Sequence, residues 1–192
     1  PTRTFPVLSA IKWNPSDFAV QEGETYTVSA HGAQYWLDGG LKVDPTGYSS
    51  HYDAASNCYV ALGRCRPHLK VRRRLPDANW MSLSCAVGEF VRPLVEVHPG
   101  REHEYRWMPL DESILQETVF NVGKEVQFLA KYTGQLICFA NDAHSSYWNN
   151  HGELQVTVTR TSWPITAETL YHPLLPACDS AQVTCPIYPP VL

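Results

Sequence analysis

The segment 141–150, with the sequence NDAHSSYWNN, concentrates side-chain oxygen donors in a short stretch of the chain. It contains one carboxylate, Asp142, and the adjacent amides of Asn149 and Asn150. Calcium is bound by about six to eight oxygen atoms, which carboxylates, amides and backbone carbonyls supply freely. A single carboxylate leaves the ion only partly neutralised, and its open positions suit neutral oxygens such as vicinal sugar hydroxyls. The segment therefore predicts a calcium site that can also hold a carbohydrate.

A plainer interpretation of the same segment stays open. Asn and Asp are favoured in turns because they tolerate left-handed backbone conformations and bond their own backbone. Asn141-Asp142 and Asn149-Asn150 could therefore be turn residues without any ligand. The segment is not an EF-hand, because the Asp-x-Asp-x-Asp-Gly pattern is missing.

Apolar and polar residues alternate with a period of two on both sides of the segment and elsewhere in the chain. Strands are expected at 136–140 and 153–159, so the segment between them is a loop. Alternation also marks strands around Tyr26 and Val28 and around Val126 and Phe128. Half-buried strands bounded by Gly and Pro turns predict an all-β fold, an antiparallel β-sandwich of the jelly-roll type.

The chain resembles a family of bacterial lectins in the residues just described. The run 134–142, the pattern Tyr147-x-Asn149-Asn150-x-Gly152 and the strand that follows resemble the signature of the PA-IL (LecA-type) lectins. Weaker similarity covers residues 5–36, the element Pro45-Thr46-Gly47 with His51, and residues 77–88. The resemblance implies a calcium-dependent, galactose-binding β-sandwich.

The resemblance also implies individual roles. Calcium would be held by side-chain oxygens of Asp142, Asn149 and Asn150 and by backbone carbonyls of Tyr35 and Ser146. Two hydroxyls of galactose would complete the coordination of the ion. The residues implied for contacts with the sugar are Tyr35, His51, Asp142, Ala143, Ser146 and Asn149. Trp36, Tyr147 and Trp148 could offer aromatic faces to a pyranose or could pack in the core or at the rim.

The chain departs from the family pattern in several places. Ser146 stands where Thr is usual, and Tyr35 follows Gly32 by one residue fewer than in the family. Trp36 is therefore a possible substitute for Tyr35. The Gln that accompanies the histidine in the family is absent next to His51. These differences leave calcium better supported than galactose.

The six cysteines indicate an exported protein. Cys58 and Cys65 lie in one short polar stretch, and residues 178 and 185 are cysteines in another. Each pair would close a small loop, which is typical of secreted proteins. Cys85 and Cys138 lie in apolar stretches, where they could pair across a sheet or remain buried thiols. We expect a secreted or extracytoplasmic location.

Two regions interrupt the alternating pattern of the expected lectin domain, 1–160. Residues 52–75 are expected to form a long loop insertion, and residues 161–192, rich in proline, a tail packed on the domain. Residues 111–118 could form a short helix. The basic run 70–74 is interpreted as a charged edge strand, with binding of an acidic glycan as the alternative.

Composition excludes several classes of function. The chain has 192 residues, 15 Lys and Arg against 19 Asp and Glu, and a net charge of -4, so general nucleic-acid binding is not expected. No apolar run approaches the roughly 18 residues of a membrane helix, so no membrane insertion is expected. His98, His103 and His144 could be imagined as zinc ligands, and Glu102 and Glu104 as hydrolase groups, but they occur in polar segments typical of solvated loops.

The sequence therefore predicts a non-enzymatic, calcium-dependent lectin for galactose-containing glycans. Single sites of this kind bind weakly, so assembly into a homo-oligomer or a longer chain would supply avidity. The alternative is a protein-interaction module in which calcium only staples the loop and the 52–75 insertion blocks the sugar site.

Overall fold

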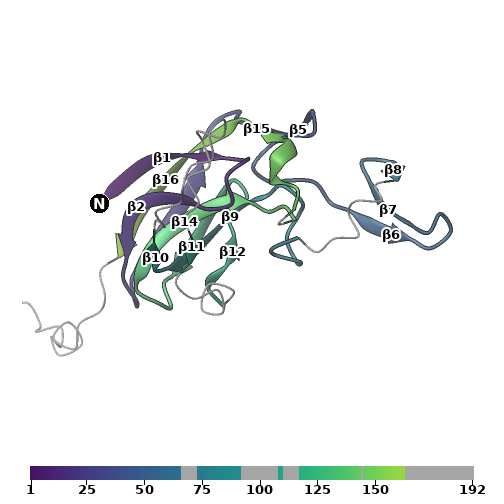
Figure 1. The fold of residues 1–192 in the computed structure, drawn as a ribbon. Helices are drawn as coiled ribbons and strands as arrows, with labels where there is room; N and C mark the ends of the chain where they lie inside the picture. Colours follow the sequence, from purple (N-terminus) through teal and green to yellow (C-terminus); the bar gives the residue numbers. More distant parts are fainter. Residues whose placement is uncertain (66–72, 92–107, 110–116, 144, 163–192) are drawn as a thin grey trace, which may run out of the picture.

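The computed structural model describes residues 1–65, 73–91, 108–109, 117–143 and 145–162. They form an antiparallel β-sandwich, as the alternating pattern predicted (Figure 1). One sheet contains, in spatial order, β1 (Thr2–Leu8), β16 (Glu153–Ser162), β3 (Thr25–Ala30) and β13 (Glu125–Leu129). The other contains β12 (Phe120–Asn121), β9 (Leu83–Gly88), β14 (Gly134–Ala140) and β2 (Asn14–Val20).

Alternating residues of the two sheets meet in a common core. Leu154, Val156 and Val158 of β16 are fully buried, while the residues between them are exposed or half-buried. Burying each of these side chains stabilises the fold by about 1.5–3 kcal/mol. On the other sheet every residue of β9 is buried, because a second apolar cluster covers its outer face. That cluster contains Trp13, Ala86, Ile137 and Phe139.

Two disulfides are present in the described part of the chain. The bond Cys58–Cys65 confirms the expected pairing in the polar stretch. The bond Cys85–Cys138 joins directly opposed residues of β9 and β14, which decides between the two alternatives that the sequence left open. Residues 178 and 185 lie outside the described residues, as do most of the tail and almost all of the expected helix at 111–118.

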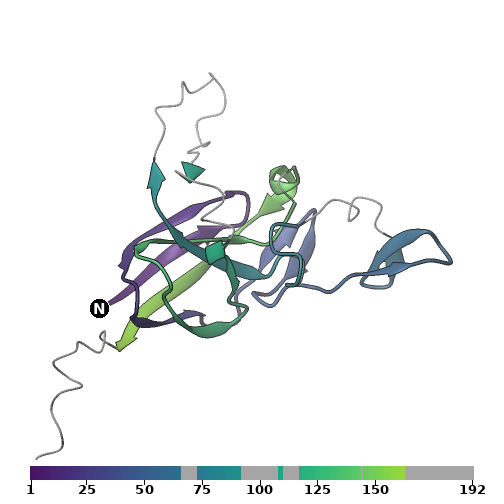
Figure 2. The ribbon, with the colours of Figure 1, turned by 90° about the horizontal axis from the view of Figure 1, so that it is seen from below.

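The 52–75 insertion differs from the expected loop, because its described part is largely β-structure. The strands β6 (His51–Asp53), β7 (Cys58–Ala61) and β8 (Arg64–Cys65) form an antiparallel arm, which projects from the sandwich in both views (Figures 1 and 2). Asn57 and Gly63 adopt positive φ angles of 49° and 71° at its turns. The disulfide then ties β7 to β8, so this short sheet holds without a core of its own.

Two small sheets complete the described structure. The strands β15 (Asn150–His151), β4 (Trp36–Asp38) and β5 (Leu41–Val43) form a three-stranded sheet at one end of the sandwich. The strands β10 (Phe90–Val91) and β11 (Met108–Pro109) pair with each other. Within the described ranges, no helix has the length and apolar character needed to span a membrane.

Candidate calcium and carbohydrate site

Of the three residues predicted to bind calcium, Asp142 and Asn150 are hydrogen-bonded to each other, and Asn149 directly precedes Asn150 in the chain. Asp142 follows β14, Asn149 ends the short 3-10 helix η2 (Tyr147–Asn149), and Asn150 begins β15. The side-chain amide of Asn150 donates to Oδ2 of Asp142 at 2.9 Å. Asp142 and Asn150 are 4% and 1% exposed. We call the group Asp142, Asn149 and Asn150 the cradle.

Two buried amide oxygens of the cradle have no hydrogen-bond donor among the described residues. They are Oδ1 of Asn149 and Oδ1 of Asn150. Their orientation is fixed by the other end of each amide, because Nδ2 of Asn149 donates to Asp38 and Nδ2 of Asn150 donates to Asp142. A buried acceptor without a partner costs about 1–3 kcal/mol. An ordered water or a cation can supply the missing partner of such oxygens.

The backbone carbonyls expected to bind calcium lie at the same end of the sandwich. The carbonyl of Ser146 accepts from the backbone N–H of Asn149 at 3.3 Å, which leaves a second lone pair free for another partner. Tyr35 immediately precedes β4, which pairs with β15. A Cβ atom added to Gly152 would lie 3.8 Å from the carbonyl oxygen of Tyr35. Both carbonyls therefore border the elements that hold the cradle.

The loop is held rigidly by buried groups beneath it. The hydroxyl of Tyr147 donates to the carbonyl of Ala140 at 2.5 Å and accepts from Arg74 at 2.9 Å. Burial raises the pKa of this phenol, and the positive charge of Arg74 acts in the opposite direction. The guanidinium of Arg74 also lies 3.5 Å from the ring centroids of Trp13 and of Phe139. The loop carrying the cradle is thus supported by a buried cation and aromatic rings.

Arg74 corrects one interpretation of the sequence. The basic run 70–74 was expected to form a charged edge strand or to bind an acidic glycan, yet Arg74 is only 6% exposed. Its charge is accommodated by the rings above and by hydrogen bonds to Tyr147 and to the carbonyl of Lys12. Residues 70–72 lie outside the described residues.

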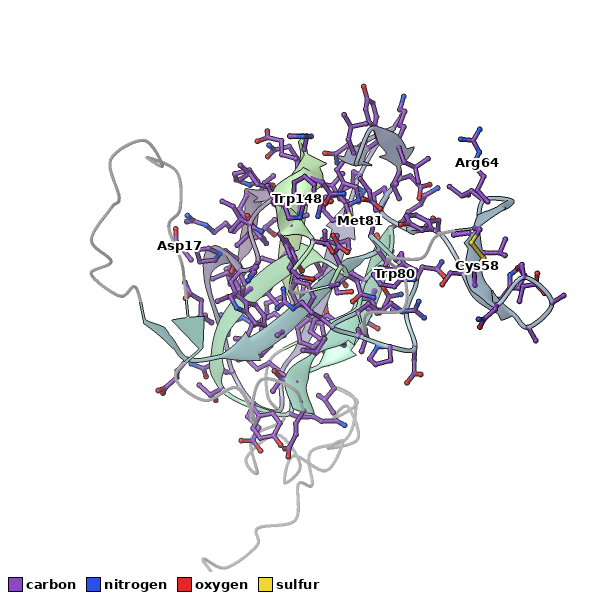
Figure 3. The ribbon with its side chains drawn as sticks, turned by 45° about the vertical axis from the view of Figure 1, so that its right-hand side comes forward. Asp17, Cys58, Arg64, Trp80, Met81 and Trp148 are labelled. Atoms are coloured by element: carbon purple, nitrogen blue, oxygen red, sulfur yellow. A yellow bond between two sulfur atoms is a disulfide. The ribbon has the colours of Figure 1, made fainter. Side chains whose placement is uncertain are left out.

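The structure separates the two neighbouring aromatic residues of η2. Tyr147 is 4% exposed and belongs to the core, whereas Trp148 is 82% exposed. Figure 3 shows Trp148 on the body of the sandwich and Cys58 and Arg64 on the projecting arm. Trp36, the possible substitute for Tyr35, is fully buried and donates its indole N–H to Met81. Trp148 is therefore the aromatic ring of this segment that can meet a ligand.

The structure also describes His51 and Ala143, two further residues expected to contact the sugar. His51 is exposed at the start of β6, next to Ser50, whose hydroxyl accepts from the indole N–H of Trp80 at 2.9 Å. Ala143 is 1% exposed, and its N–H donates to the carboxylate of Asp142 at 2.7 Å. That hydrogen bond leaves the backbone N–H of Ala143 committed within the loop. His144 lies outside the described residues.

Asp38 and Tyr48 belong to the site and were missed by the sequence reasoning. Asp38 pairs with Asn150 across β4 and β15, and its Oδ1 accepts from Nδ2 of Asn149 at 2.9 Å. Its Oδ2 accepts from the hydroxyl of Tyr48 at 2.6 Å. Near Asp38 the sequence shows the turn residues Gly39-Gly40, which mark the end of a strand. They do not indicate that Asp38 pairs with Asn150, because that pairing depends on the register between strands more than a hundred positions apart.

Comparisons with known proteins add a likeness to solved structures at low sequence identity. No protein-family model matches the chain, and no curated protein matches it. Among solved structures, the chain is similar to the EclA N-terminal domain, described as a PllA-like lectin, with a TM-score of 0.41 and 18% sequence identity. The alignment covers 83% of this chain and 96% of that chain.

Proposed function

We propose that the protein is a calcium-dependent, non-catalytic lectin that binds galactose-type sugars through a bridging calcium ion. The observation that carries this proposal is the pair of buried amide oxygens of Asn149 and Asn150, which lack donors among the described residues; the amide of Asn150 is bonded to the Asp142 carboxylate and that of Asn149 to the Asp38 carboxylate. Calcium would satisfy these oxygens together with the carbonyls of Tyr35 and Ser146. Two sugar hydroxyls would then complete the coordination of the ion.

The surroundings of the cradle support binding of a sugar rather than of calcium alone. Trp148 presents an almost fully exposed indole ring next to Asn149. An exposed aromatic face is suited to pack against the C–H groups of a pyranose. The described strands of the arm project from the sandwich, so they do not cover Trp148. This arrangement favours the lectin over the interaction module with an occluded site.

Calorimetric titration of methyl β-galactoside, first with calcium and then with EDTA, tests the proposal. Binding should appear with calcium and disappear with EDTA. Asp142→Asn keeps the side-chain shape but removes the charge, so it should abolish calcium-dependent binding, whereas the exposed control Asp77→Asn should bind like the parent. Sugar binding that survives EDTA would refute the bridging ion. Calcium binding without any sugar heat would instead establish the interaction module.

The two disulfides are consistent with a secreted or extracytoplasmic location, which we propose on that basis. Galactose-containing glycans on cell surfaces are the partners that follow from such a location. A homo-oligomer would raise the avidity of a weak single site.

A further inference from the structure

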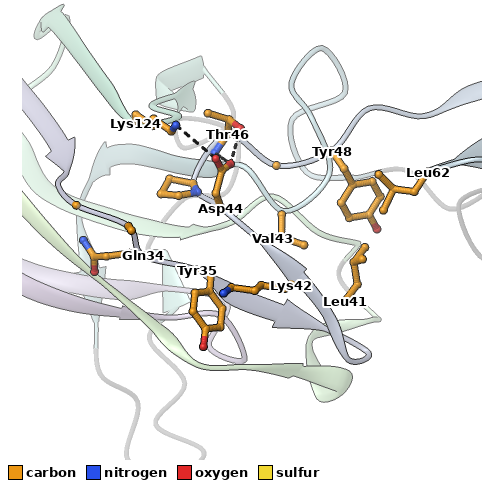
Figure 4. A pocket seen from close by; sticks show the side chains of 14 residues that line it. Gln34, Tyr35, Leu41, Lys42, Val43, Asp44, Thr46, Tyr48, Leu62 and Lys124 are labelled. Atoms are coloured by element: carbon orange, nitrogen blue, oxygen red, sulfur yellow. Dashed lines mark hydrogen bonds and ion pairs between the residues drawn. The ribbon is translucent and has the colours of Figure 1, made fainter.

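An open groove lies next to the cradle. It has a volume of about 600 Å³ and is lined by residues of the β4–β5 region, by Lys124 and by Leu62 from the arm (Figure 4). Its wall includes the ring of Tyr35, with the ammonium of Lys42 3.6 Å from the ring centroid, and the side chain of Tyr48. The groove therefore combines aromatic, apolar and charged hydrogen-bonding groups.

The groove and the cradle share a carboxylate. Asp38 accepts from Asn149 of the cradle at 2.9 Å and from the Tyr48 hydroxyl, in the groove wall, at 2.6 Å. The cradle lies at β15 and the groove at β5, the two outer strands of the same three-stranded sheet. Neighbouring strands are about 4.8 Å apart, so about 10 Å separates these two strands. This separation is on the scale of two linked hexose rings.

Leu62 gives the groove an apolar border, because its side chain is 55% exposed. Its φ angle of 53°, followed by 71° at Gly63, is the positive-φ geometry that a two-residue hairpin turn requires. Leu62 lines the groove from the turn between β7 and β8, which the Cys58–Cys65 disulfide closes.

The carboxylate of Asp44 is a second charged group in the lining of the groove. Burial would raise the pKa of Asp44, but hydrogen bonds from Thr46 and the charge of Lys124 lower it below its usual value. The ammonium of Lys124 lies 3.5 Å from the Asp44 carboxylate. Asp44 is therefore a charged acceptor for hydroxyl groups, and Lys42, two positions earlier in the chain, is a donor in the same groove.

We propose that this groove binds the second sugar of a galactose-terminated oligosaccharide, whose terminal galactose is held at the cradle. The proposal rests on the proposed function for the position of the first sugar. Lys42 donates to hydroxyls of the second ring, and Leu62 packs against its apolar face. The insertion thus extends the binding site and adds selectivity for the glycan beyond its terminal residue.

Calorimetry with calcium and a panel of disaccharides tests this subsite. Lactose, melibiose and galactosyl-α-1,3-galactose are compared with methyl β-galactoside and methyl α-galactoside. At least one disaccharide should bind about fivefold more tightly than the matched methyl galactoside, which corresponds to about 1 kcal/mol. Lys42→Ala and Leu62→Ser should each reduce the ratio of the disaccharide affinity to the methyl galactoside affinity toward one. Both variants should leave the affinity for the methyl galactosides unchanged.

The chain offers matched controls on another part of its surface. Lys131 and Leu129 are also exposed, and Lys131→Ala and Leu129→Ser should keep the full disaccharide ratio. If no disaccharide exceeds its methyl galactoside, or if the gain survives in both groove variants, the subsite is refuted. Failure of the methyl galactosides themselves to bind with calcium would refute the proposed function instead, so the two failures are distinguishable.

Discussion

At the scale of single residues, the chemistry of the cradle lies in the contrast between one carboxylate and two amides. Asn150 donates to Oδ2 of Asp142 through its amide nitrogen, and its own oxygen has no donor among the described residues. An amide therefore serves two purposes at this position. Its nitrogen donates a hydrogen bond to the carboxylate of Asp142. Its oxygen offers a further ligand atom without adding a second negative charge.

Asn150→Asp tests this arrangement. The substitution replaces the amide nitrogen that lies 2.9 Å from Oδ2 of Asp142 by a carboxylate oxygen. Two carboxylates then face each other, and the hydrogen bond between the two side chains is lost. Without calcium we expect a loss of about 3 kcal/mol in the free energy of unfolding, since a buried charge is left uncompensated. With calcium the loss should largely disappear, because a site with more negative ligands binds the ion more tightly. Chemical denaturation with calcium and with EDTA measures both values.

The exposed Asn121 of β12 supplies the control for this substitution. Asn121→Asp should change the free energy of unfolding little and equally in both conditions. A loss in Asn150→Asp that is independent of calcium would contradict a cation site at the cradle.

At the scale of strands, a buried ion pair joins the start of β3 to the end of β16. Glu24 is 1% exposed, and Arg160 donates to both of its carboxylate oxygens at 2.8 and 3.0 Å. The hydroxyl of Tyr26 donates to the same carboxylate. This hydrogen bond, opposed by burial and supported by Arg160, lowers the pKa of Glu24 below its ordinary value of 4.5.

The lowered pKa of Glu24 predicts a dependence of stability on pH. A carboxyl group with a depressed pKa in the folded state stabilises the fold above the unfolded pKa, and this contribution is lost as pH falls through the folded pKa. Urea unfolding should therefore show a loss of stability from pH 5 downward. Glu24→Gln should be less stable than the parent at pH 7 but should lose less stability as the pH falls. The control Glu125→Gln, at an exposed position, should keep the pH dependence of the parent. Equal slopes for Glu24→Gln and the parent would show that Glu24 does not carry this dependence.

The strands were largely predictable because period-two alternation directly reports which face is buried. The expected faces of Tyr26 and Val28 and of Leu154, Val156 and Val158 are confirmed. The three residues predicted to bind calcium could be selected by residue type. The structure joins Asp142 to Asn150 by a hydrogen bond and places Asn149 at the end of η2. The arm was interpreted as a loop because its strands are too short for a clear pattern. The position of Asp38 depends on register between distant strands, which the sequence does not encode locally.

At the scale of the whole molecule, the proposed calcium site draws on distant segments, so ion binding there would be coupled to the fold. The cradle joins the end of β14 to β15, and Asp38 links it to β4. An unfolded chain cannot assemble these residues, so calcium bound at the cradle would favour the folded state. Its binding free energy would then add to the stability of the fold.

Calcium should therefore raise the melting temperature. At a free concentration of about 100 times Kd the stabilisation is about 2.7 kcal/mol, and a chain of this size gains about 2–4 °C for each kcal/mol. Differential scanning calorimetry should show an increase of about 5–10 °C. Magnesium should have a smaller effect, since it is smaller and demands near-octahedral geometry. A melting temperature that is unchanged by saturating calcium would mean that the amide oxygens of the cradle are not ligands.

The disulfide Cys85–Cys138 has a consequence for how this chain responds to cleavage. Its two cysteines are 53 positions apart in the sequence and lie opposite each other in β9 and β14, at the centre of one sheet. A protease that cuts the backbone anywhere between them leaves both fragments covalently joined. A single cut within the segment 86–137 therefore leaves a protein that migrates as one species until a reducing agent is added, and β14, which leads to the cradle, stays tied to β9.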